Sequence, residues 1–109
     1  MLEKLNLQYK IKNLQIQIHR NAVTKKFWNK DQDISIYHEA TVIALIGSEV
    51  NEAIEAHRNG NMENLKEELA DIVIRTLDVA EHFDFNLMEA VHDKMIINKQ
   101  RPNKHNKRY

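Results

Sequence analysis

The chain has very few residues that could turn a β-strand: two glycines and one proline among 109 residues. Sheets need such turns at short intervals, so this scarcity argues against strands. Apolar residues recur instead at helical spacing, as Leu7, Ile11, Leu14 and Ile18 do. The sequence therefore predicts an all-α fold.

Boundary signals predict four helices. Ser35 is a candidate N-cap, Asn59-Gly60 is a helix-ending signal, and Pro102 cannot continue a helix. The expected ranges are residues 5–26, 35–58, 62–83 and 87–100. The turn around residues 59–61 is short, so the second and third helices are expected to be antiparallel neighbours.

Length and composition limit the class of protein. A chain of 109 residues predicts one domain, residues 1–109, with a short basic tail from about residue 102. A helical chain of this size has a small core, so pairing with copies of itself would complete the bundle. There is no cysteine, which excludes disulfides and thiolate zinc sites. The sequence shows neither a bilayer-spanning apolar run nor a secretory leader, so we expect a soluble cytoplasmic protein without a membrane partner.

Four acidic residues form two pairs with the same spacing. Glu49 and Glu52 lie three residues apart, and so do Glu68 and Asp71. Residues three apart share a helix face, so each pair can direct two carboxylates at one point. Two packed helices could then hold a hard cation such as Mg²⁺.

Glu49 carries the strongest physical argument of the four. It falls near the middle of an apolar arc on the second helix, and Glu52 lies on the shoulder of that arc. The arc consists of Val42, Leu45, Ile46, Val50 and Ala53. An ionised carboxylate that faces a core costs several kcal/mol unless it is paired or bound to a metal.

The second pair is less decisive by itself. Glu68 and Asp71 could be ordinary surface charges, with Asp71 paired to Arg75 four residues later. However, Glu52 lies about as far before the short turn as Glu68 lies after it. The two pairs are therefore expected to be level with each other, as a shared metal site requires.

A basic segment and a few aromatic residues complete the candidate site. From residue 94 to the C-terminus there are six Lys or Arg and no acid. Lys94, Asn98 and Arg101 follow helical spacing and are candidates to bind phosphate, although such runs are also common as solvated tails. Trp28 is a candidate stacking surface for a base, together with His19, but it could equally cover the core.

The order and spacing of these parts resemble one enzyme family. Glu-x-x-Glu, fifteen residues and Glu-x-x-Asp look like the signature of the MazG-like all-α nucleoside triphosphate pyrophosphohydrolases. The segment from residue 68 to residue 78 is similar to the third helix of that family, and residues 94–107 are similar to its ending. The resemblance covers most of the chain from about His19 onward.

The resemblance implies a four-helix MazG-like bundle and a house-cleaning enzyme that cleaves a nucleoside triphosphate between its α and β phosphates. Mg²⁺, with Mn²⁺ able to replace it, would be held by the four acidic residues. Glu49, Glu52 or the neighbouring Glu39 would activate the attacking water. The basic segment would contact the phosphates, and Trp28 with His19 would border the base. The resemblance also implies a homodimer or homotetramer whose sites are lined by more than one subunit.

Two other classes of function remain open at this point. A non-catalytic helical oligomer that serves as an interaction module would bind no Mg²⁺. A nucleic-acid-binding protein led by the basic tail would show strongly salt-dependent binding, but the tail lacks interleaved aromatic residues, so nucleic acid is not the expected partner.

Overall fold

The computed structural model describes residues 2–102, and the side chains of residues 6–102. The chain forms four helices: α1 (Leu2–Thr24), α2 (Ile36–Arg58), α3 (Met62–His82) and α4 (Leu87–Gln100). The prediction of an all-α fold is confirmed, and no strand occurs within this range. The tail from Asn103 to Tyr109, which we expected to be basic and irregular, lies outside the described residues.

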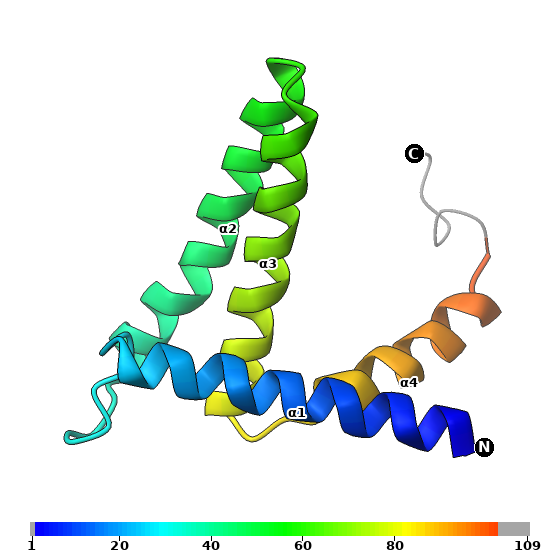
Figure 1. The fold of residues 1–109 in the computed structure, drawn as a ribbon. Helices are drawn as coiled ribbons and strands as arrows, with labels where there is room; N and C mark the ends of the chain where they lie inside the picture. Colours follow the sequence, from blue (N-terminus) through cyan, green and yellow to red (C-terminus); the bar gives the residue numbers. More distant parts are fainter. Residues whose placement is uncertain (1, 103–109) are drawn as a thin grey trace.

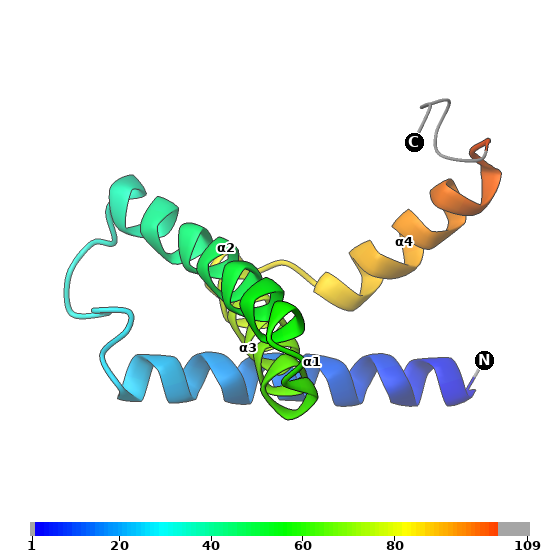
Figure 2. The ribbon, with the colours of Figure 1, turned by 90° about the horizontal axis from the view of Figure 1, so that it is seen from above.

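The helices form an open arrangement (Figures 1 and 2). α2 and α3 pack side by side as an antiparallel hairpin, as the short turn predicted, and α1 crosses the base of that hairpin. α4 contacts α1 and diverges from the hairpin. Completion of the bundle by other copies of the chain stays a prediction.

The predicted N-cap of α2 is confirmed. The Ser35 hydroxyl accepts a hydrogen bond from the backbone N–H of His38 at 3.0 Å, and thereby fixes the start of α2. Asn61 and Asn86 cap α3 and α4 in the same way, at 3.1 and 3.2 Å. Polar side chains before each helix thus set where it begins.

Two helices end earlier than predicted, because residues other than glycine adopt left-handed backbone conformations. Lys26 has φ 63°, and the N–H of Phe27 returns to the carbonyl of Ala22 at 2.9 Å, so α1 ends at Thr24 and not at Lys26. Asp84 (φ 58°) has the same effect after α3. Gly60 (φ 69°) ends α2 at the predicted place.

The buried core is small and includes polar groups. Its apolar members are Trp28, Val42, Ala53, Ala56, Leu77 and Ala80. The polar residues Gln15, Glu49 and Asp78 are also buried. Val50, which was predicted to face the core, is 40% exposed, so the apolar side of α2 is only partly covered by this chain. Among the described helices, none is long and apolar enough to cross a bilayer.

Candidate metal centre and the adjoining cavity

Three carboxylates meet between α2 and α3. Glu49 comes from α2, and Glu68 and Asp71 come from α3. One oxygen atom of each lies within 4.8 Å of an oxygen of the other two. The antiparallel packing of α2 and α3 makes this possible, because it brings Glu49 level with Glu68 and Asp71. The cluster contains oxygen donors only, the type that hard divalent cations prefer.

Glu52 is the exposed member of the acidic group. Its carboxylate lies close enough to Glu49 and Glu68 to change the pKa of each. It therefore stands at the edge of the cluster, where solvent reaches it.

Glu49 is held by an arginine. Arg75 Nε donates a hydrogen bond to Glu49 Oε1 at 2.8 Å, and Glu49 is only 8% exposed. This contact lowers the pKa of Glu49 below its usual value, against the opposing effect of burial. The sequence suggested instead that Arg75 would pair with Asp71 on the same helix.

Glu68 has no cationic partner among the described residues. Its Oε2 atom is buried and accepts no hydrogen bond from the residues that the structure describes. The carboxylates of Glu49 and Glu52 beside it raise the pKa of Glu68 to about 7. A buried, unpartnered oxygen within an all-oxygen cluster fits a hard divalent cation such as Mg²⁺ or Mn²⁺.

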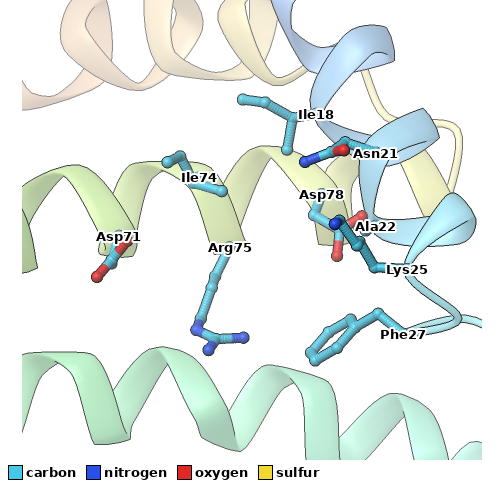
Figure 3. A pocket seen from close by; sticks show the side chains of 9 residues that line it. All are labelled: Ile18, Asn21, Ala22, Lys25, Phe27, Asp71, Ile74, Arg75 and Asp78. Carbon is cyan, nitrogen blue, oxygen red and sulfur yellow. The ribbon is translucent and has the colours of Figure 1, made fainter.

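A cavity of about 280 Å³ adjoins the cluster. It opens between the end of α1, the loop after α1, and α3 (Figure 3). Its polar lining consists of Asn21, Lys25, Asp71, Arg75 and Asp78, and Phe27 forms one wall. Asp71 belongs both to the cluster and to the cavity, and Arg75 lines the cavity while it binds Glu49, so the two are continuous.

Trp28 contacts Asp78, one of the residues that line this cavity. The indole is 1% exposed, stacks on the ring of His82 with 4.0 Å between centroids, and donates from Nε1 to both oxygens of Asp78 at 2.9 and 3.0 Å. This burial argues against Trp28 as a stacking surface for a base. His19, whose Nδ1 lies 2.7 Å from Asp78 Oδ1, belongs to the same network.

Glu39 is placed away from the carboxylate cluster. It lies ten residues before Glu49 on α2, which corresponds to about 15 Å along the helix. Its carboxylate lies 2.7 Å from Nε2 of His82. The geometry does not support Glu39 as the residue that activates water.

The structure does not bring the basic segment to the site within one chain. Lys94, Asn98 and Arg101 are exposed, and α4 carries them away from the α2–α3 hairpin (Figure 1). Contacts between these residues and phosphate would therefore require α4 of another copy.

Three functional candidates, Arg75, Asp78 and Phe27, were missed by the sequence analysis. Arg75 follows Glu68 by seven residues, and Asp78 follows Asp71 by seven, so each lies two turns along the same helix face. That spacing was the available signal for Arg75. Phe27 had no comparable signal, because its position depends on the left-handed turn at Lys26.

The family model of the MazG nucleotide pyrophosphohydrolase domain matches residues 37–105. Searches of curated proteins and of solved structures found no match. The matched range contains both acidic pairs and α4, but it begins after Phe27 and Trp28. The wall that α1 and the following loop contribute to the cavity therefore lies outside the matched range, and the wall from α3 lies inside it.

Proposed function

Because the chain belongs to the MazG nucleotide pyrophosphohydrolase family, we propose that it hydrolyses a nucleoside triphosphate between the α and β phosphates, with a divalent metal ion. Membership supports nucleotide pyrophosphohydrolase activity at the level of the family. The observation that carries the finer proposal is the buried Glu68 oxygen, which has no partner in a cluster of carboxylates.

Glu49, Glu52, Glu68 and Asp71 would hold the ion, Mg²⁺ by preference and Mn²⁺ as a substitute. When bound, the ion supplies positive charge that neutralises the triphosphate and the leaving pyrophosphate. The four carboxylates would fix the position of the ion between α2 and α3.

We assign activation of water to Glu52. Its carboxylate is exposed to solvent, whereas Glu49 is only 8% exposed. Glu52 accepts a proton from water as the oxygen of that water bonds to the α phosphorus. The bond from the α phosphorus to the bridging oxygen breaks, and pyrophosphate leaves with that electron pair. The products are a nucleoside monophosphate and pyrophosphate.

The base would occupy the cavity beside the cluster. Phe27 offers an aromatic wall, and the Asn21 amide can both donate and accept hydrogen bonds to the edge of a base. His19 and Trp28 would border the base indirectly, because both bind Asp78, which lines the cavity.

The phosphate-binding role of Lys94, Asn98 and Arg101 remains part of the proposal. We propose that the chain forms a homodimer or homotetramer in which α4 of one copy lies over the cluster of another. Several large apolar side chains are exposed on α2 and α4 and would be covered in this way, among them Ile43, Ile54, Met95 and Ile96.

The proposal is tested with a panel of ribo- and deoxynucleoside triphosphates and Mg²⁺, with pyrophosphate and orthophosphate measured separately. We expect pyrophosphate as the first product. Glu49→Gln should abolish turnover and leave the helical circular dichroism signal intact. Glu55→Gln serves as the matched control, because Glu55 is an exposed glutamate of the same helix. Orthophosphate as the first product, or full activity of Glu49→Gln, would contradict the proposal.

A further inference from the structure

Arg75 connects the carboxylate cluster with the cavity. Its side chain leaves α3 toward α2 and lies beside Phe27 (Figure 3). Its Nε binds Glu49, while its Cζ lies 5.5 Å from the centroid of the Phe27 ring, a cation–π distance. The Arg75 side chain is 29% exposed and that of Glu49 is 11% exposed. The guanidinium thus has one contact in the cluster and another in the cavity.

A guanidinium and a divalent cation compete for the same carboxylate. Both bind its lone pairs, and the two positive charges repel each other strongly at the short distances of a partly buried site. The ion pair with Arg75 stabilises Glu49 when no metal is bound. Binding of an ion would make that contact unfavourable.

From this geometry we propose that Arg75 is an internal counter-ion that a divalent cation displaces from Glu49, and that the displaced guanidinium then binds the triphosphate of the nucleotide. The inference rests on the proposed metal-dependent function. The contact with Phe27 can persist after displacement, because it lies on the cavity side. Arrival of the ion would therefore transfer positive charge from the cluster to the place where the phosphates bind.

The inference predicts that Arg75→Met changes the affinities for two ligands in opposite directions. Mn²⁺ should bind roughly ten- to a hundredfold more tightly in the absence of nucleotide, since a charge-assisted hydrogen bond is worth about that ratio. A non-hydrolysable α,β-methylene triphosphate should bind roughly tenfold or more weakly at saturating Mg²⁺. A defect in folding would weaken both.

Isothermal titration calorimetry at pH 7 measures both affinities. Arg58→Met is the matched control, because Arg58 forms an exposed pair with Glu55 at 3.4 Å and its loss changes the net charge equally. We expect it to alter Mn²⁺ affinity by less than about twofold at physiological salt. Mn²⁺ binding that is equal or weaker in Arg75→Met would overturn the exchange. Unchanged binding of the nucleotide analogue would overturn the second step.

A measurement on the unaltered protein covers the case in which Arg75→Met does not fold. The Arg75 Nε–H should give a protected ¹⁵N resonance in the metal-free protein, because it is bonded to Glu49. Saturation with Mg²⁺ should shift that resonance and end its protection, and an unchanged resonance would overturn the exchange. Failure of the unaltered protein to bind any divalent ion would overturn the metal centre and the exchange with it.

Discussion

Raising the pH from 6 to 8 should strengthen Mg²⁺ binding, because Glu68 must lose a proton before it can bind an ion. The neighbouring carboxylates of Glu49 and Glu52 raise the pKa of Glu68 to about 7. At pH 6 about one-tenth of the Glu68 side chains would be ionised, and at pH 8 about nine-tenths. The apparent association constant should therefore rise about tenfold across this range, with most of the change below pH 7.

Calorimetry in two buffers with different ionisation enthalpies counts the protons released when Mg²⁺ binds. We expect about 0.9 protons at pH 6 and about 0.1 at pH 8. In Glu68→Gln, binding should be weaker and independent of pH over this range. Glu67→Gln is the control, because Glu67 is the exposed neighbour of Glu68. Equal binding enthalpies in the two buffers at pH 6 would refute the reasoning.

The raised pKa of Glu68 also predicts how the stability of the metal-free protein depends on pH. The pKa of Glu68 is higher in the folded protein than its usual 4.5, so the folded state holds this proton more tightly than the unfolded state does. The resulting stabilisation is complete below about pH 4.5 and is lost as the pH rises through 7. Mg²⁺ should therefore raise the melting temperature more at pH 8 than at pH 6. An equal rise in melting temperature at both pH values would contradict a raised pKa at Glu68.

Two further predictions concern folding. Trp28→Phe removes the indole donor from both oxygens of Asp78, which is 3% exposed. The free energy of unfolding, measured by urea denaturation, should fall by roughly 2–3 kcal/mol. A loss below about 1 kcal/mol would show that the hydrogen bond is not formed in solution. Gly60→Ala should lower the free energy of unfolding by about 1 kcal/mol, because Gly60 has φ 69°. Gly47 lies inside α2, and an added Cβ would have no atom within 4 Å, so Gly47→Ala should raise the free energy of unfolding by up to about 1 kcal/mol. Thermal melts of both variants check the opposite signs, and destabilisation by Gly47→Ala would indicate that another chain packs against this position.

Local signals predicted the helices well, because caps act within a few residues. Ser35 and Gly60 define the ends of α2 through contacts with their own turns. Lys26 and Asp84 escaped prediction, because a left-handed conformation at these residue types has no distinctive sequence signal. The crossing of α1 over the hairpin also could not be derived, since it depends on contacts between residues distant in the sequence, such as Gln15 with Glu81 and Phe85.

The candidate site was predictable only where a residue broke the pattern of its own helix. Glu49 interrupts an apolar arc, and its burial agrees with that observation. Arg75 did not interrupt a pattern, because Asp71 four residues earlier offered an ordinary surface partner. Trp28 was ambiguous, since an aromatic residue after a helix can cover a core or face a ligand. Its contact with Asp78 distinguishes these roles and lies fifty residues away in the sequence.

One face of α3 carries the proposed ligands of the ion, the Arg75 guanidinium that the ion would displace, and Asp78, which anchors the cavity wall. Glu68 and Asp71 belong to the carboxylate cluster, while Arg75 and Asp78 lie two turns further along the same face, at about 10 Å. Asp78 binds Trp28, and Trp28 directly follows Phe27, so the anchor also sets the wall against which Arg75 lies. A change at Asp78 should therefore affect nucleotide binding through Phe27 while leaving the ion ligands in place. Asp78→Asn is the variant that separates the two, and equal weakening of ion and nucleotide binding would contradict this division of roles.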